Sequence, residues 1–369
     1  MNTVLLRHKR VVALGAAALA SIMLLTSCAG NEPTTASNSN PSPSLSGTIS
    51  GAGASSQGSA QDAWIAAFQT ANRGVTINYD PTGSGAGRGT FAAGGSSFAG
   101  SDSSLNADEI AAGFQSCTDD SGYIEVPAYI SPIAVIFNVE GIDKLNIDAP
   151  TLAGIFKGAI SSWDDPAIAA LNPGMTFPSS AITAVHRSDD SGTTKNFTDY
   201  LHQNSPNVWD QKPSDTFPYQ SGEAAQGTSG VVNAVTNGSN TIGYADASRA
   251  GSLGSAALKV GDKFVPYSPE AAAAVVAGSP AGITAGPTDL SINIDRKTTD
   301  STHYPLVLVS YIITCNEFKD AKVAPIVKAY LKYITGIDGQ KVAADAAGSA
   351  PLSSNLSDKV ASVLDGIKQ

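Results

Sequence analysis

Four short stretches of the chain combine glycine with hydroxyl and charged residues, and their types and spacing could do chemistry. They are GAGASS at 51–56, GSGAG at 83–87, GSD at 100–102 and RSDDSGTT at 187–194. Such a stretch can supply a nucleophilic serine, a phosphate-binding loop, or donors that bind an anion without reacting with it. The rest of the sequence has to distinguish these three kinds of site.

A hydrolase would need a serine that is activated by a histidine, which an acidic residue orients. Ser191, His186 and Asp189 could fill these roles for an ester or a phosphoester. Alternation along a strand argues against this, because His186 and Arg187 point to opposite faces of the sheet. Ser191 also lacks the G-x-S-x-G pattern, with Asp189 two residues before it and Thr193 two after. We therefore predict that the chain is not an enzyme.

Motifs for nucleotides and metals are excluded by position. A G-x-G-x-x-G loop needs glycine at its sixth position, which holds Ser56 when counted from Gly51. Counted from Gly83, that position holds Arg88, and Lys195 is not preceded by the glycine spacing of a Walker A loop. The four histidines are scattered, and none has the spacing of a zinc ligand pair. The sequence predicts neither a metal site nor a cofactor.

Arg187 suits an anion, because its planar guanidinium can donate to two oxygens of one ligand. The alternative is an ion pair on the surface with Asp189 or Asp190, which would be structural only. The two interpretations combine if Asp189 orients Arg187 toward the ligand. We expect this combined arrangement.

Ser191, Gly192 and Thr193 stand where a helix is expected to begin. The free N–H groups and partial positive charge of a helix N-terminus attract an anion, and glycine lets the backbone approach it closely. The alternative role of Ser191 is that of a helix N-cap. Both roles use the same N–H groups, so we expect these three residues to contact the anion.

Asp102 is the most informative residue, because a carboxylate repels an anion unless it accepts a proton that the anion carries. Phosphate near neutral pH carries such a proton and sulfate does not, so Asp102 would select phosphate. The alternative is that Asp102 caps a helix in the following segment SSLNADEI. Ser84, which lies between two glycines, could be a turn residue only.

Alternating strands and helices must position these stretches. Alanines and aromatic residues at helical spacing, Trp64 and Phe68 among them, predict a helix over 59–73 with a core-facing stripe. We expect a short helix at APTLAGIFKG, capped by Thr151, and a buried strand at PLVLVSYIIT. Each polar stretch follows a predicted strand, and three of them begin a helix. This pattern indicates an α/β fold, in which ligands bind beyond the carboxyl ends of strands.

Residues 1–27 have the features of a secretory signal. Arg7, Lys9 and Arg10 precede the apolar run VVALGAAALASIMLL, which is short for a membrane span. The next residues, LTSC, resemble a bacterial lipobox, and this resemblance implies cleavage before Cys28 and lipid attachment to its sulfur. The alternative is an ordinary secretory signal. Residues 28–46 are poor in large apolar side chains, and we expect a flexible tether there.

The cysteine content and the charge constrain the environment and the partners. Cys117 and Cys315 are expected to form a disulfide outside the cytoplasm, the alternative being two separate buried thiols. With 22 basic and 32 acidic residues the chain has a net charge of −10, which repels nucleic acid. We expect no nucleic-acid partner, and an anion site would have to work by local donors against this field.

Five segments occur in the order and spacing of the periplasmic phosphate-binding proteins of ABC-type phosphate transporters. They are GAGASS, YDPTGSGAGRGTF, FAGSD, TLAGIFKGAISSWDDPAIAALNP and VHRSDDSGTTKNFTDYL. The chain resembles the lipid-anchored form of this family. The resemblance implies an α/β clamshell of the type II periplasmic binding protein fold, with mixed sheets flanked by helices. Lobe I would comprise 47–130 and 305–369 and lobe II 131–304, with hinge strands near Ala128–Pro132 and around Tyr304.

The resemblance also implies the ligand set and the partners. The residues carried over as phosphate ligands are Ser55, Ser56, Ser84, Asp102, Arg187, Ser191, Gly192 and Thr193, with Asp189 behind Arg187. The family commonly has an aromatic residue where Ser56 stands, so only the backbone donor carries over at that position. The implied protein is an extracytoplasmic monomer, lipid-anchored to the cell membrane, that binds inorganic phosphate and delivers it to an ABC permease. Sulfate, molybdate or a phosphorylated organic compound are the alternative ligands.

Overall fold

The computed structural model describes residues 45–282 and 286–368. The expected signal peptide at 1–27, the expected lipidation site Cys28 and most of the expected tether lie outside the described residues. No described helix combines the length and the apolar character that crossing a membrane requires.

The described strands form a mixed sheet. Their bounds are β1 Ser46–Gly53, β2 Gly74–Asp80, β3 Phe98–Ser101, β4 Tyr123–Asn138, β5 Lys144–Ile147, β6 Thr183–Arg187, β7 Glu223–Ala225, β8 Thr241–Asp246, β9 Gly254–Val260, β10 Lys263–Val265 and β11 Val307–Cys315. The order of neighbours is β2-β1-β3-β11-β4-β8-β6-β7, and β9 joins β4 to β5 and β10. β1 is parallel to β2 and β3, and β6 is parallel to β7 and β8, whereas β11 and β4 are antiparallel to their neighbours along this path.

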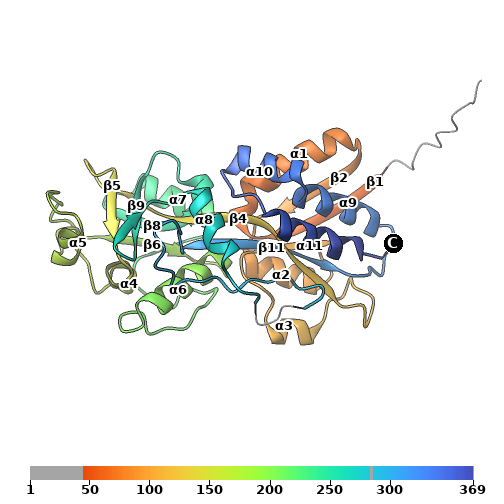
Figure 1. Cartoon of the computed structure of the whole chain (residues 1–369), viewed down its shortest axis with the longest axis horizontal. Coiled ribbons are helices and arrows are strands. Elements are labelled where there is room, and N and C mark those ends of the chain that lie inside the picture. The colour runs from red at the N-terminus through yellow and green to blue at the C-terminus, as the bar shows by residue number, and fades with distance from the viewer. Residues whose placement is uncertain (1–44, 283–285, 369) are drawn as a thin grey trace, which may run out of the picture. The chain divides into compact units, whose positions relative to one another are not determined.

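Helices connect most of the strands. Their bounds are α1 Gly58–Ala71, α2 Ser84–Ala92, α3 Ala107–Ala112, α4 Ala149–Lys157, α5 Pro166–Leu171, α6 Gly192–Asn204, α7 Gly227–Asn237, α8 Pro269–Ala277, α9 Ala324–Thr335, α10 Ile337–Ala347 and α11 Ser354–Asp365, with short 3-10 turns at Ser55–Gln57 and Ala247–Arg249. Figure 1 shows α1, α9, α10 and α11 on one side of the strands β1, β2 and β11, and α2 and α3 on the other. The helix predicted over 59–73 is α1, and its Trp64 and Phe68 are buried in the core as expected.

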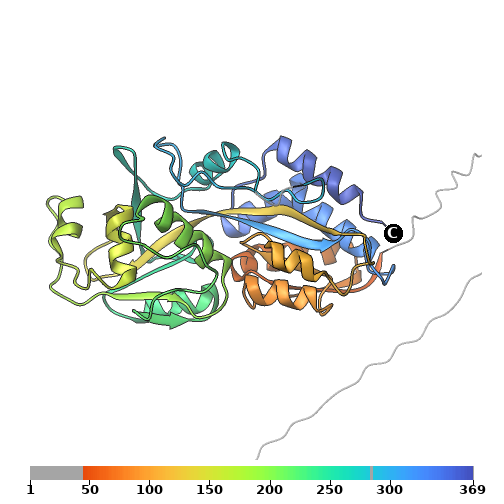
Figure 2. The ribbon, with the colours of Figure 1, turned by 90° about the horizontal axis from the view of Figure 1, so that it is seen from below.

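β4 is the longest described strand, and it changes partners along its length. From Tyr123 to Pro132 it pairs with β11, and from Ile133 to Asn138 it pairs with β8. Figures 1 and 2 show β4 and β11 side by side through the middle of the described fold. The partner change falls at the end of the segment Ala128–Pro132 that the sequence suggested as a hinge. Both strands are buried along nearly their whole length, which explains their continuous apolar runs.

The Cys117 and Cys315 sulfur atoms are joined in a disulfide, although these residues lie 198 positions apart in the sequence. Cys315 ends β11, and Cys117 follows α3 by a few residues. The bond therefore ties the central strand to the segment that follows the third polar stretch. Both cysteines are buried.

The N-cap of α4 differs from the sequence prediction. Thr151 was expected to cap α4, but the helix begins at Ala149, and the side chain of Asp148 accepts a hydrogen bond from the Thr151 N–H. That prediction was wrong because Pro150 sits in the first turn, where a proline needs no N–H partner and moves the cap to the residue before Ala149.

Candidate functional site

The four polar stretches lie at the ends of β1, β2, β3 and β6, as the alternation of elements predicts. The first continues into a 3-10 turn and α1, the second begins α2, and the fourth begins α6. Glycine is needed where they meet. At Gly83, with φ of +106°, an added Cβ would lie 2.4 Å from a carboxylate oxygen of Asp189. The second and fourth stretches are therefore in direct contact.

Asp102 lies at the centre of this arrangement and is buried. Its Oδ1 accepts hydrogen bonds from the hydroxyls of Ser56 and Ser310, each at 2.6 Å. Its Oδ2 accepts one from the Thr193 hydroxyl at 2.8 Å. The carboxylate thus joins the first, third and fourth polar stretches and the central strand β11.

The electrostatics of Asp102 result from two opposing effects. Burial raises the pKa of its carboxyl, while the hydroxyls of Ser310, Ser56 and Thr193 and the charge of Arg187 lower it, and burial is the larger effect. The alternative role of Asp102 as a helix cap is wrong. The side chain of Asn106 caps α3 through a capping box with Glu109.

The N-terminus of α6 touches Asp102 directly. A Cβ at Gly192 would lie 2.7 Å from the Asp102 Cβ and 2.7 Å from the Ser103 nitrogen, so only glycine fits without a shift. The Asn196 amide donates to the Asp102 carbonyl at 2.7 Å. The approach of α6 to the third stretch therefore depends on the absence of a side chain at Gly192.

Ser191 and Ser84 both act on backbone N–H groups. The Ser191 hydroxyl accepts from the Thr194 N–H at 3.2 Å and so caps α6, which is the alternative that the sequence left open. The Ser84 hydroxyl accepts from the Asp102 N–H at 3.1 Å. Ser84 therefore does more than form a turn, because its hydroxyl holds the backbone N–H of Asp102.

Arg187 is buried, and its guanidinium donates from Nε and Nη2 to the two carboxylate oxygens of Asp189. Asp189 Oδ1 also accepts from the Gly227 N–H at 3.0 Å. Burial of Asp189 acts to raise the pKa of its carboxyl, but the Arg187 bonds and charge outweigh burial and hold it below the ordinary value. The ion pair is therefore internal, not one of exposed side chains, and it fixes the orientation of Arg187.

The Ser55 side chain contacts the start of α7 and not the Asp102 carboxylate. Its hydroxyl accepts from the Thr228 N–H at 3.0 Å and lies 3.1 Å from the Thr228 hydroxyl, at the start of α7. Ser56, predicted to use its backbone only, contacts Asp102 through its side chain. A serine at this position thus adds a hydroxyl where the resemblance suggested a ring.

The sequence did not single out Ser310, Gln57 or Asn196, all of which are buried at the site. Gln57 donates to Ser310 at 2.7 Å, and Ser310 donates to Asp102. A signal for Ser310 existed, since it is a serine inside the apolar run VLVSYII of a buried strand. A polar residue in such a strand needs a partner.

Arg88 forms a second connection between distant segments. Its guanidinium donates to Glu109 and to Asp215, both at 2.8 Å. The Ser103 hydroxyl also donates to Asp215 at 2.8 Å. Arg88 is thus engaged by carboxylates of other segments, and the arginine whose charge lowers the pKa of Asp102 is Arg187.

His186 and Ser191 have different partners. The His186 ring stacks on Phe217 at 3.9 Å between centroids, and its Nδ1 lies 3.0 Å from the Arg187 carbonyl. The Ser191 hydroxyl accepts from the Thr194 N–H, as described above. The Arg187 side chain contacts Asp189 and not Phe217, which agrees with the alternation expected of a strand.

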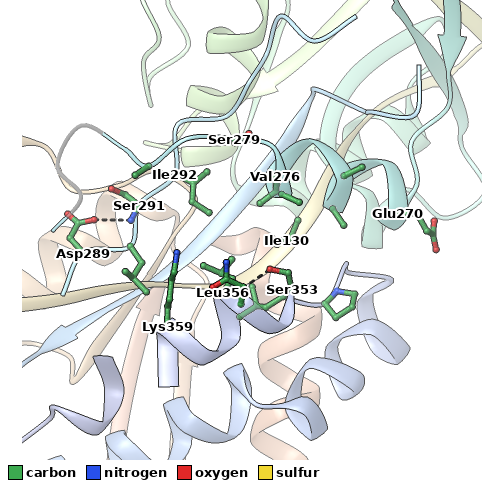
Figure 3. A pocket seen from close by; sticks show the side chains of 18 of the residues that line it. Ile130, Glu270, Val276, Ser279, Asp289, Ser291, Ile292, Ser353, Leu356 and Lys359 are labelled. Carbon is green, nitrogen blue, oxygen red and sulfur yellow. Dashed lines mark hydrogen bonds between the residues drawn. The ribbon is translucent and has the colours of Figure 1, made fainter. Parts of the chain in front are cut away.

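Two cavities lie near the centre of the described fold. One of about 440 Å³ reaches Asp102 and is also lined by Lys195, Asn196 and Arg296. A larger one of about 710 Å³ lies between α8 and α11 (Figure 3), where Ile130, Val276, Ile292 and Leu356 give it a largely apolar lining. We place the candidate anion site at Asp102, because the hydroxyl donors converge there and not in the larger cavity.

Comparison with known proteins identifies the family to which the chain belongs. The PBP superfamily domain model matches residues 38–337. Phosphate-binding protein PstS 3 of Mycobacterium leprae (strain TN) is 36% identical over 295 residues, which are 78% of this chain and 79% of the relative. Phosphate-binding protein PstS 2 of Mycobacterium tuberculosis (strain ATCC 25618 / H37Rv) is 31% identical over 362 residues, covering 94% and 96%.

Solved structures show the same fold. A high-affinity periplasmic phosphate-binding protein solved with bound phosphate gives a TM-score of 0.69 at 22% identity, covering 86% of this chain and 93% of that one. A phosphate-binding protein from Stenotrophomonas maltophilia gives 0.65 at 21% identity, covering 86% and 94%. The predicted α/β, two-lobed periplasmic binding protein fold is thereby confirmed. The chain belongs to the PBP superfamily and, within it, to the family of PstS phosphate-binding proteins.

Proposed function

We propose that this protein binds inorganic phosphate outside the cytoplasm and delivers it to the permease of an ABC-type phosphate transporter. The observation that carries the proposal is the buried Asp102 carboxylate, which is surrounded by hydroxyl donors and lies against the N-terminus of α6. A carboxylate in an anion site can accept a hydrogen bond from the anion only if the anion is protonated, as phosphate is near neutral pH. The names of the relatives support the same ligand.

The proposed ligands are the backbone and side-chain donors of the four stretches, Arg187 among them, and the acceptor Asp102. They comprise Ser55, Ser56, Ser84, Asp102, Arg187, Ser191, Gly192 and Thr193, with Asp189 holding Arg187 in position. The donors supply local positive potential, which is required because the chain carries a net charge of −10. The guanidinium and the helix N-terminus are suited to oxyanions of this size.

We propose that binding involves closure of two lobes, 47–130 with 305–369 and 131–304. Contacts between these parts support the proposal: Asp215 accepts from Arg88 and Ser103, and the Gly85 N–H donates to the Asp190 carbonyl at 3.1 Å. The partner change of β4 after Pro132 supplies a place for a hinge. The ligand would be enclosed by residues of both parts.

Further proposals concern anchoring and chemistry. The lipobox-like sequence supports attachment of a lipid at Cys28 and a position at the outer face of the cell membrane, and we expect a monomer. We propose that the site performs no catalysis, because Ser191 is engaged as a helix cap and His186 stacks on Phe217. Sulfate or molybdate remains the alternative ligand class.

Calorimetric titration with inorganic phosphate, paired with an assay of phosphomonoester hydrolysis, tests the proposal. We expect saturable binding at one site and no turnover. Absence of binding would overturn the proposed function. Turnover that disappears in Ser191→Ala would instead identify an esterase.

A further inference from the structure

Ser310 lies opposite Asp102 beside the ladder between β11 and β3, because the next residue, Tyr311, pairs with Ser101 in antiparallel register. On the other side of β11, Ser310 pairs with Tyr129 and Tyr311 with Pro127, so Ala128 is left as an extra residue on β4. Such bulges are common beside functional sites. The Gln340 amide satisfies the Ala128 carbonyl at 2.8 Å. The Ser310 hydroxyl lies 2.6 Å from Asp102 Oδ1.

The direction of the Ser310 hydrogen bond is set from behind by Gln57. The Gln57 amide nitrogen lies 3.2 Å from the Tyr311 carbonyl, which can only accept, so this end of the amide is the donor. The same nitrogen lies 2.7 Å from the Ser310 hydroxyl oxygen. Ser310 therefore accepts from Gln57 and has its own hydrogen left for Asp102.

Two more buried groups hold the orientation of Gln57. Its carbonyl oxygen accepts from the Gln61 amide at 2.8 Å, and the Gln61 oxygen accepts from the Tyr330 hydroxyl at 2.7 Å. Burial raises the pKa of Tyr330 well above its ordinary value, so its hydroxyl stays a donor. The chain of bonds runs in one direction, from Tyr330 to Asp102.

Counting acceptor sites shows what this direction leaves for a ligand. An ionised carboxylate has about four lone-pair sites, two on each oxygen. On Asp102, Ser56 and Ser310 occupy both sites on Oδ1, and Thr193 occupies one on Oδ2. One site remains, on Oδ2, and it can only accept.

We propose that Gln57 and Ser310 are positioning residues that commit Asp102 to accepting, so that the free site on Oδ2 takes a hydrogen only from a protonated oxyanion. This inference deepens the proposed function and rests on it. A fully deprotonated oxyanion such as sulfate would present lone pairs to that site. The selectivity for phosphate would thus originate partly in residues that never touch the ligand.

The charged and titratable groups that face Asp102 come from three strands. Arg187 of β6 lowers the pKa of the Asp102 carboxyl. Asp246, at the end of β8, has a pKa raised to about 6, mainly by burial, with a small contribution from the charge of Asp102. The pKa of Tyr79 on β2 is raised by burial first and then by Asp102. The groups nearest to Asp102 on α6 and β11, Thr193, Asn196 and Ser310, are uncharged. Because the pKa of the Asp246 carboxyl is raised as well, the test must observe Asp102 itself.

The test is an NMR titration of the Asp102 carboxyl carbon in the ligand-free protein, with Asp102→Asn used to assign the resonance. In Ser310→Ala the midpoint should move to higher pH, because one donor to the ionised form is lost. Gln57→Met should move it in the same direction by less, since Ser310 can then rotate. Ser96→Ala is the matched control, because this buried serine hydroxyl has no hydrogen-bond partner among the described residues.

Calorimetry on the same variants tests whether the chain of hydrogen bonds from Tyr330 to Asp102 contributes to ligand selectivity. The ratio of phosphate to sulfate affinity should fall about tenfold in Ser310→Ala, which corresponds to one hydrogen bond to a charged group, and stay unchanged in Ser96→Ala. An unmoved midpoint in both Ser310→Ala and Gln57→Met would overturn the inference, and Gln57→Met alone decides if Ser310→Ala does not fold. If the wild-type protein bound no phosphate, the proposed function would be rejected. The titration of the Asp102 carboxyl carbon would still decide whether Gln57 and Ser310 keep Asp102 an acceptor.

Discussion

Burial alone would favour a neutral Asp102, and the three hydroxyls that donate to it oppose that tendency. A side chain so placed is sensitive to the loss of any single donor. Arg187 shows the same principle with the opposite charge, since a buried guanidinium is stable only with a partner. At the scale of single residues, the charged groups Asp102 and Arg187 therefore have their hydrogen-bond partners in place without a ligand.

Asp189→Asn tests this for the Arg187 pair. The pKa of Asp189 is held below its ordinary value, so its pairing stabilises the fold above the unfolded-state pKa, and that contribution is lost as the pH falls through the folded-state value. We expect a loss of roughly 2 kcal/mol in unfolding free energy at pH 7, because Arg187 is left buried without its charge partner. The loss should shrink toward pH 3.

Denaturant unfolding at the two pH values measures this effect. Asp190→Asn is the matched control, since Asp190 is exposed and its carboxylate accepts from the Thr216 hydroxyl and not from Arg187. Equal stability of Asp189→Asn and wild type at pH 7 would mean that the pair contributes little to the fold.

At the scale of elements, the position of α6 depends on glycine. A Cβ at Gly192 would lie 2.7 Å from Asp102 and Ser103, so Gly192→Ala must push the helix N-terminus away. We expect phosphate affinity to fall at least about tenfold, the equivalent of overpacking by one methyl group. Calorimetry of the variant measures it.

Gly89→Ala provides the comparison, because Gly89 lies in α2 and an added Cβ there meets nothing within 4 Å. That variant should bind phosphate as the wild type does, with stability raised by up to about 1 kcal/mol. If Gly192→Ala also bound phosphate normally, α6 would not form part of the site.

The elements themselves could be predicted because their signals are local. Glycine and serine directly after an apolar strand mark the turns that contain Ser84 and Gly192, and helical spacing marks α1. The contact between Ser310 and Asp102 joins residues 208 positions apart, and it depends on the pairing of β11 with β3, which no local pattern indicates. Asp148 as the cap of α4 could have been recognised from the proline that follows, whereas the partners of Arg88 required the tertiary fold.

At the scale of the whole molecule, a buried carboxyl on β4 makes stability depend on pH. Glu125 on β4 is buried, and its pKa is raised to about 8, mainly by burial and then by the charge of Asp289. Between pH 4.5, the ordinary pKa of a glutamate, and pH 8, Glu125 therefore keeps its proton in the folded protein and has lost it in the unfolded chain. Stability should fall as the pH rises through that window.

We expect the loss to be about 2 kcal/mol between pH 6 and pH 8, and Glu125→Gln to remove most of it. Denaturant unfolding across that range measures the slope. Glu140→Gln, at an exposed position, should leave the slope as in the wild type. A Glu125→Gln variant with the wild-type slope would place the pH dependence elsewhere.

The central claim is that Asp102 selects the ligand by accepting a hydrogen bond from its proton. The ratio of phosphate to sulfate affinity tests this claim most directly. Calorimetric titration of the wild type and of Asp102→Asn with both anions at pH 7 gives this ratio. We predict a preference for phosphate of at least about a hundredfold in the wild type, and a preference reduced to about tenfold or less in Asp102→Asn. Equal binding of both anions by the wild type, or an unchanged preference in Asp102→Asn, would contradict it.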